Sequence, residues 1–222
     1  MMRRDTAYRR QAGFTIVELL IATAVFAMVM VLITVGVLSF TRSYYKGINQ
    51  SNTQAAARTI LEDVSQAIQF SGDVVTAPIV QSGSGTPKSS GICVGSRRYS
   101  YLPGWQVIDS GADAAKNQGA HSLVLDTPGN CAGMWAQDLI GNNLTGGSVE
   151  MMPPHMRLAK FKVEHVGAAT DVWQVTVRVV YGDNDLLDDP TGENARCKAN
   201  ISGTEYCAQA ELTTTVKKRI GQ

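Results

Sequence analysis

The chain has 222 residues and a formal net charge of +1. This length fits one domain with at most an appendage, and the near-neutral charge excludes a protein that binds nucleic acid over its whole surface. The charges are unevenly spread, because the first 13 residues hold four arginines and one aspartate. The remainder of the chain is therefore mildly acidic.

A long apolar segment follows this basic leader. Residues 19–41, LLIATAVFAMVMVLITVGVLSFT, contain no charged side chain, and about 20 such residues in a helix cross a bilayer. Because the arginines precede the segment, the positive-inside rule predicts the leader in the cytoplasm and the rest outside. A cleaved secretory signal would have a shorter apolar core, although ATA at 22–24 could mimic its cleavage site.

One carboxylate, Glu18, lies at the start of the apolar segment. A carboxylate inside a membrane span costs about 2.5–3.5 kcal/mol and usually has a partner. A plain membrane anchor explains the length and the arginines, but it explains neither Gly13 nor Glu18. A glutamate that snorkels to the membrane edge is the structural alternative.

The stretch from Gly13 to Ala22, GFTIVELLIA, resembles the class III signal of type IV pilins and pseudopilins. In that family a membrane aspartyl protease, the prepilin peptidase, cuts after the glycine and methylates the new amino terminus. The resemblance implies that residues 1–13 are a cleaved leader and that Phe14 becomes the methylated first residue. It also implies that Glu18 pairs with the Phe14 amine of a neighbouring subunit. Head-to-tail contacts of this kind build open helical filaments.

The helix is expected to run from about residue 15 to about residue 69. Its first half, 14–41, would span the membrane or form the filament core. In its second half, 42–70, apolar residues recur at three- and four-residue spacing: Ala57, Ile60, Leu61, Val64, Ala67 and Ile68. We expect this amphipathic half to pack on the rest of the chain, with exposed residues 47–54 as its weakest part.

Short β-type segments follow residue 70, separated by glycine and proline. Candidate strands lie within 91–102, 121–127, 157–166, 172–182 and 208–220, and 82–91 reads as a flexible loop. The segment at 157–166 alternates, with one face formed by Ala159, Phe161 and Val163. The next segment does the same with Trp173, Val175, Val177, Val179 and Tyr181.

These patterns predict an α+β fold. The head, residues 71–222, would form an antiparallel sheet that covers the apolar stripe of the helix. This layout resembles the pilin globular domain and, more loosely, the larger minor pilins and pseudopilins of the W or J kind.

Four cysteines follow the apolar segment, on the predicted outer side where disulfides persist. Three pairings are open. Cys197–Cys207 is favoured because a short polar segment separates the two residues, and Cys93–Cys131 follows by default. A zinc site is the alternative, but no C-x-x-C spacing is present and the histidines show no ligand spacing.

An acidic loop, YGDNDLLDDP, is the one candidate for a metal. Its oxygen-bearing side chains suit calcium: Asp183, Asp185, Asp188 and Asp189. The spacing differs from that of an EF-hand, so a solvated acidic loop is the simpler interpretation. No cofactor is otherwise implied.

No catalytic motif is present, whether G-x-S-x-G, a glycine-rich phosphate loop or H-E-x-x-H, so we do not expect an enzyme. The basic clusters at 97–98 and 217–219 are small, and direct nucleic-acid binding is not expected. The sequence predicts a minor subunit of a type IV pilus that serves adhesion, motility or DNA uptake. Its partners would be other pilins, the prepilin peptidase and the assembly platform with its ATPase. The alternatives are a pseudopilin of a type II secretion system and a membrane-anchored binding module.

Overall fold

The computed structural model describes residues 13–70, 74–75, 89–109, 112–113, 116, 118–129, 131, 136–140, 144, 146–167, 171–199 and 202–219. It comprises two compact units, Met1–Ser43 and Tyr44–Gln222. The predicted leader, except Gly13, lies outside the described residues, as does most of the loop expected at 82–91.

A single helix, α1 (Ile16–Phe70), contributes to both units. This agrees with the expected bounds within one residue at each end. In its first part, up to Ser43, no side chain is buried, and the helix is long and apolar enough to cross a membrane by length and composition. Hydroxyl groups there bond back to the helix, since Thr34 and Thr41 donate to the carbonyls of Met30 and Val37 at 2.8 Å. Their polarity is thus satisfied internally.

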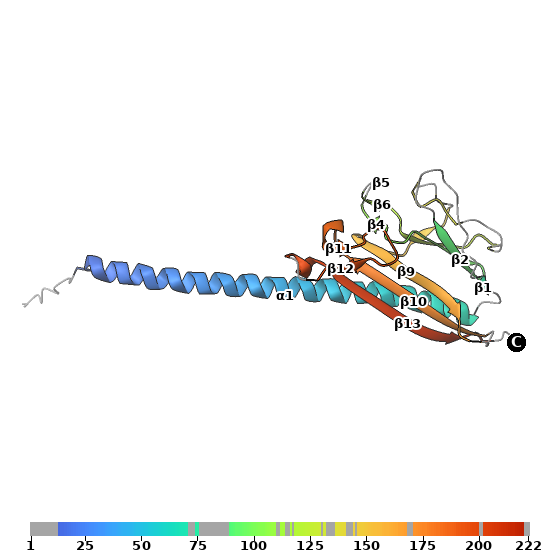
Figure 1. The fold of residues 1–222 in the computed structure, drawn as a ribbon, viewed down its shortest axis with the longest axis horizontal. Helices are drawn as coiled ribbons and strands as arrows, with labels where there is room; N and C mark the ends of the chain where they lie inside the picture. The colour runs from blue at the N-terminus through green and yellow to red at the C-terminus, as the bar shows by residue number, and fades with distance from the viewer. Residues whose placement is uncertain are drawn as a thin grey trace, which may run out of the picture. The chain divides into compact units, whose positions relative to one another are not determined.

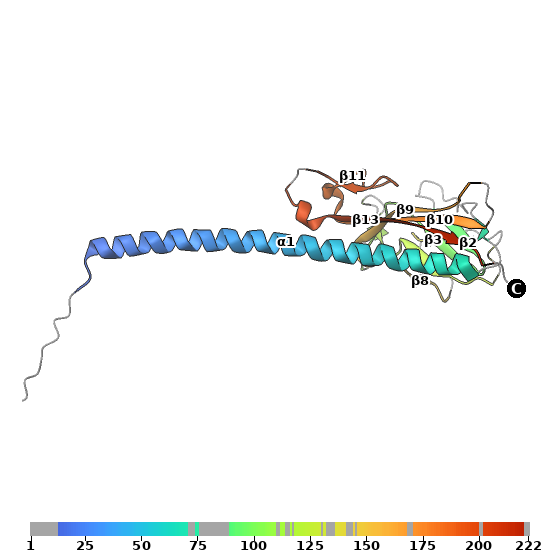
Figure 2. The same ribbon diagram turned by 90° about the horizontal axis from the view of Figure 1, so that it is seen from below.

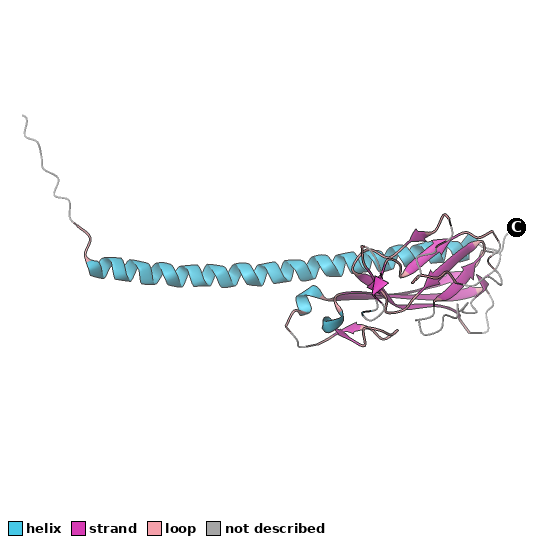
Figure 3. Cartoon of the chain, turned by 90° about the horizontal axis from the view of Figure 1, so that it is seen from above, coloured by secondary structure: helices cyan, strands magenta, loops and turns pink. Residues whose placement is uncertain are grey.

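The second part of α1 buries one face against the head, as Figure 3 shows for the strands beside it. Its buried residues are Thr53, Ala56, Ala57, Ile60, Val64, Ala67 and Ile68. All six predicted stripe residues pack in the core, with Leu61 only partly buried. The expectation of an exposed segment at 47–54 holds for five of its eight residues and fails at Asn49, Gln50 and Thr53. Asn49 and Gln50 donate side-chain bonds to the backbone carbonyls of Glu205 and Gln209, and Thr53 is fully buried.

Two sheets and a small ribbon make up the described part of the head (Figure 1). The first sheet has the order β1 (Val74–Val75), β2 (Ser90–Val94), β3 (Arg97–Tyr101), β7 (Leu123–Asp126) and β8 (Val149–Glu150). The second has the order β13 (Ala208–Lys217), β10 (Val172–Tyr181), β9 (Met156–His165), β4 (Gln106–Val107), β6 (Gln118–Gly119) and β5 (Ala112–Asp113). The pairs are antiparallel except β4 with β6. Both sheets join α1 in one core.

The long strands show where the predicted alternation holds and where it fails. On β10, Trp173, Val175, Val177 and Val179 all enter the core beside α1, as expected. On β9 the alternation breaks, because the register shifts between Arg178 and Val179. Arg178 faces Lys160 while Val179 faces Leu158, so Ala159 is the extra residue of a β-bulge. Leu158 therefore takes the core position predicted for Ala159.

A second layer covers the opposite face of the long strands (Figure 2). It contains β11 (Leu187–Asp188), β12 (Arg196–Cys197) and the 3-10 turns η2 (Asn184–Leu186) and η3 (Thr204–Tyr206). Its small apolar core comprises Ala159, Val180, Leu187, Ala195 and Cys207. The bulge at Ala159 thus supplies a side chain to this second core.

Candidate functional site

The start of α1 holds the residues that the sequence singles out for processing and assembly. Thr15 precedes the helix, and its backbone N–H and its hydroxyl both donate to Oε2 of Glu18, at 3.0 and 2.9 Å. The Glu18 N–H donates back to Oγ1 of Thr15 at 3.3 Å. This reciprocal pair is a capping box, which satisfies backbone donors at the helix start. The signal T-x-x-E is readable in the sequence, but sequence reasoning missed it.

The capping box changes how Glu18 is understood. Within one chain the carboxylate already has a structural role, so its presence does not by itself require another subunit. Both bonds from Thr15 reach Oε2, and a carboxylate can accept about four hydrogen bonds. The group therefore has capacity for a further donor, such as an ammonium. Phe14, beside it, is 80% exposed.

Gly13 has no packing reason to be glycine. A Cβ built on this residue meets no atom within 4 Å, and its backbone is not in the left-handed region. Glycine is required by a fold where a turn, a close approach or a positive φ demands it. None of these applies at Gly13, so the chain's own structure does not explain the residue.

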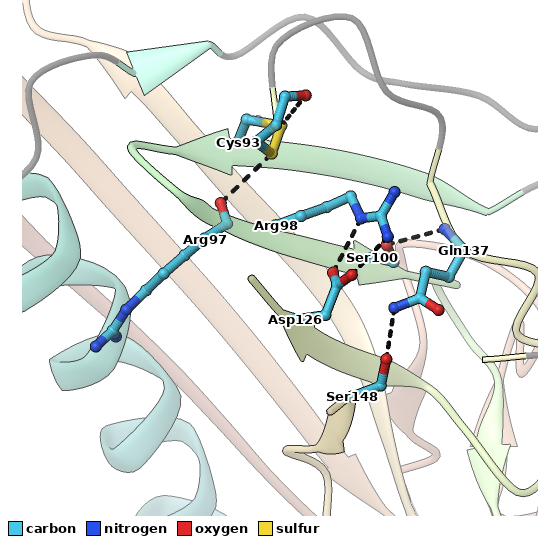
Figure 4. Close-up of polar contacts among 8 residues, drawn as sticks. Cys93, Arg97, Arg98, Ser100, Asp126, Gln137 and Ser148 are labelled. Atoms are coloured by element: carbon cyan, nitrogen blue, oxygen red, sulfur yellow. Dashed lines mark hydrogen bonds and ion pairs between the residues drawn. A yellow bond between two sulfur atoms is a disulfide. The ribbon is translucent and has the colours of Figure 1, made fainter. Parts of the chain in front are cut away.

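The cations of the two basic clusters have partners within the head. Arg97 points toward α1, where it donates to Asp63 at 2.8 Å, while Arg98 points to the other side of β3 and bonds Asp126 at 2.9 Å (Figure 4). Lys217 lies 3.5 Å from Asp171. The guanidinium of Arg219 stacks 5.5 Å above the Phe70 ring. Each of these four cations thus has a partner in the head, although the Lys217 side chain is 73% exposed.

The acidic loop does not gather its carboxylates. Among the described residues, which include all four candidate aspartates, no group of three histidine, cysteine or acidic side chains could hold a metal ion. The loop is instead ordered around the buried Arg157 guanidinium. Nη1 donates to Oδ1 of Asn184 at 2.8 Å and to the Pro190 carbonyl at 3.0 Å, and Nη2 donates to the Gly182 carbonyl. Burial lowers the pKa of Arg157 to about 10, so the group stays charged at neutral pH.

The cysteines form two disulfides, Cys93–Cys131 and Cys197–Cys207. This is the pairing favoured from the sequence. Cys93–Cys131 ties β2 to the loop after β7, and the second bond closes the segment that contains η3. Each restricts the unfolded chain, which is a general source of stability.

Comparison with known proteins finds one family model that matches the beginning of the chain. Residues 8–34 match the family described as "Prokaryotic N-terminal methylation motif". The match includes Gly13, Phe14 and Glu18, and it ends within the apolar segment. No curated protein and no solved structure matches the chain significantly. The chain thus carries the prepilin-type methylation motif that is typical of type IV pilins and pseudopilins, and this motif points to a structural rather than an enzymatic protein.

Proposed function

We propose that the chain is a minor subunit of a type IV pilus. It is made as an inner-membrane precursor, cut after Gly13 by the prepilin peptidase, methylated on Phe14 and assembled by a platform and its ATPase into an extracellular filament. The observation that supports this most is Glu18, the only charged residue between Gly13 and Arg42. The same proposal divides the chain into a leader (1–13), a membrane-spanning or filament-core helix (14–41), an amphipathic second half of the helix (42–70) and a head (71–222).

Electrostatics explains why the motif favours a filament. Cleavage leaves a positive amine on Phe14 at the head of an apolar helix, and that amine lacks solvation where lipid or packed helices exclude water. The Glu18 carboxylate accepts two bonds from Thr15 at the start of the helix, and acceptor sites remain on it. A neighbour shifted along the helix axis can bring its amine to the remaining acceptor sites. The contact is head-to-tail and does not close, so it generates a fibre.

Gly13 also supports the proposal, as a residue that another protein would recognise. Because nothing in the fold needs glycine there, an external agent that reads the backbone at this position is the simplest explanation. Replacing Gly13 with valine should leave the head folded and should make the uncut precursor accumulate in the membrane, as judged by its apparent mass on immunoblots. Normal cutting of this variant would remove the argument from Gly13.

Two substitutions separate the assembly role of Glu18 from its capping role. Glutamine can keep a capping box but cannot form an ion pair, whereas Thr15→Ala removes the cap and keeps the charge. We expect Glu18→Gln and Glu18→Ala to abolish incorporation into sheared surface fibres, and Thr15→Ala to be incorporated. If Glu18→Gln is incorporated like the wild type, the residue acts only as a cap and the ion pair is wrong.

The same motif occurs in pseudopilins, so the experiment needs a readout that distinguishes the two machines. Deletion of the gene should remove or shorten surface fibres if the chain is a pilus subunit. Loss of exported proteins with intact surface fibres would indicate a secretion pseudopilin instead. A membrane-anchored binding module would affect neither, and its Glu18 variants would behave as the wild type.

A further inference from the structure

An exposed aromatic patch lies at the beginning of the second unit. Tyr44 and Tyr45 on α1 are 58% and 45% exposed, and their rings meet edge to face with centroids 6.3 Å apart. Tyr206 from η3 adds a third ring, 49% exposed and 6.0 Å from that of Tyr45. Ile48 lies one helical turn beyond Tyr44 and Tyr45 and is also exposed. The patch Tyr44–Tyr45–Ile48–Tyr206 therefore presents apolar rings with polar hydroxyl tips.

The position of Tyr206 is built into the fold. The disulfide Cys197–Cys207 closes the segment that carries it, and the Tyr206 N–H donates to the Gly203 carbonyl at 2.9 Å. Asn49 of α1 donates to the backbone of Glu205, the preceding residue, at 3.4 Å. Backbone contacts and a covalent bond thus place the ring beside Tyr45, so removing the ring should leave the segment in place.

The place of the patch along α1 matches a bilayer interface. The uncharged segment ends at Thr41, and one residue advances a helix by about 1.5 Å, so Tyr44 and Tyr45 lie about 5–6 Å beyond its end. The headgroup layer on each side of the hydrocarbon core is about 5–8 Å thick. Tyrosine is enriched at this depth because its ring is apolar and its hydroxyl is wet. Arg42 and Lys46, on either side in the sequence, suit lipid phosphates.

We propose that Tyr44, Tyr45 and Tyr206 form an interfacial anchor that seats the head in the phospholipid headgroups of the outer leaflet before assembly. The inference rests on the proposed function in one respect, because it needs the precursor inserted with its head outside. The disulfide-closed segment and the helix enter the headgroup layer together, and extraction into a filament must withdraw the patch from lipid.

Fluorescence quenching by brominated lipid tests this placement in the full chain. The chain is reconstituted into vesicles of phosphatidylethanolamine and phosphatidylglycerol brominated near the headgroup end of the acyl chains. Tyr206→Trp adds an indole in the patch. Val166→Trp is the matched control, because Val166 is 40% exposed and lies at the other end of the head. Its N–H bonds to Val172, which pairs with Lys217 on β13, and β13 ends near Gln69. Gln69 lies about 36 Å along α1 from Tyr45.

We expect the emission added by Tyr206→Trp to be mostly lost in brominated vesicles, and the emission added by Val166→Trp to be unchanged. Equal, weak quenching of the two variants would overturn the anchor. If Tyr206→Trp is shielded only in assembled fibres, the patch is a contact between subunits and the lipid assignment is wrong. Extraction of the chain from the vesicles by alkaline carbonate would refute the membrane insertion itself. That result would count against the proposed function and not only against the anchor.

Discussion

At the scale of single residues, buried charges are matched by partners from distant parts of the chain. Arg98 and Asp126 have side chains only 4% and 3% exposed, and they bond across β3 and β7 (Figure 4). Arg157 is held by carbonyls and an amide, and Tyr99 donates to Asp63 on α1 at 2.7 Å. Burial raises the pKa of Tyr99, so this hydroxyl stays a donor. These contacts fix α1 and the strands in one arrangement.

The buried ion pair gives a test of mutual dependence. Asp126→Asn removes the carboxylate that faces the Arg98 guanidinium, and breaking a buried pair costs about 3–5 kcal/mol. The double variant Arg98→Met/Asp126→Leu removes both charges and should recover much of that loss. Urea unfolding of a chain that begins at Tyr44 measures both. Equal destabilisation of the single and double variants would show that the pair is not coupled.

A second pair predicts a pH dependence. Arg178 bonds Glu211 across β10 and β13 at 2.8 Å, which, with Lys160 nearby, holds the pKa of Glu211 below its ordinary 4.5. A lowered carboxyl pKa stabilises the fold above the unfolded value, and this contribution is lost as pH falls through the folded pKa. Glu211→Gln should cost about 0.5–1 kcal/mol at pH 7, given that the carboxylate is partly exposed. The difference in the free energy of unfolding between Glu211→Gln and the wild type should disappear as the pH falls below 4.5.

Glu164→Gln is the control for this pH profile. Its carboxylate is 62% exposed and lies 3.7 Å from Lys162. In urea titrations at each pH, we expect Glu164→Gln to lower the free energy of unfolding much less than Glu211→Gln does. A gap for Glu211→Gln that widens toward acid would contradict the predicted direction of the pH dependence.

At the scale of elements, the sequence predicts those features of helices and strands that depend only on the spacing of nearby residues. The helix bounds and the core face of β10 follow from spacing alone. The core face of β9 does not, because the bulge at Ala159 arises from pairing with a strand that comes later in the chain. The sequence does not show that Asn49 and Gln50 are partly covered, because their partners, the backbone of Glu205 and Gln209, lie far away in sequence. Long-range contacts thus account for both errors.

One turn between elements should be intolerant of a side chain. Gly104 has φ +74°, and a Cβ there would lie 2.6 Å from the Thr191 carbonyl carbon. Gly147 has a similar φ, +86°, but no atom within 4 Å of such a Cβ. Both alanine variants bear the cost of a left-handed backbone, about 1–2 kcal/mol, but only Gly104→Ala adds a clash with backbone.

Thermal unfolding of the two alanine variants measures the difference. Gly147→Ala should lower the melting temperature by a few degrees, and Gly104→Ala by clearly more. Similar melting temperatures would mean that the segment around Thr191 moves away without loss, and that the turn is not a fixed contact.

At the scale of the whole molecule, one chain combines an exposed helical segment without charge, residues 19–41, with a disulfide-bonded head. The apolar segment and the methylation motif could be found from the sequence, because they depend on hydropathy and on one short pattern, while the roles of Gly13, Phe14 and Glu18 in cutting and assembly stay predictions. The capping role of Glu18 was readable as T-x-x-E, but the meeting of Tyr45 with Tyr206 was not, because it depends on the folded geometry. Nor could the sequence predict that Arg157, from β9, bonds to the acidic loop, while the calcium candidate at that loop stays a prediction.

The central claim is that an amine exposed on Phe14 pairs with Glu18 of a neighbour. Intact-mass spectrometry of the protein from native membranes and sheared fibres tests it most directly. We predict a chain that begins at Phe14, carries one added methyl group and is present in both fractions. A chain in the fibres that still begins at Met1, with its arginine-rich leader, would contradict the account, because no such amine would exist.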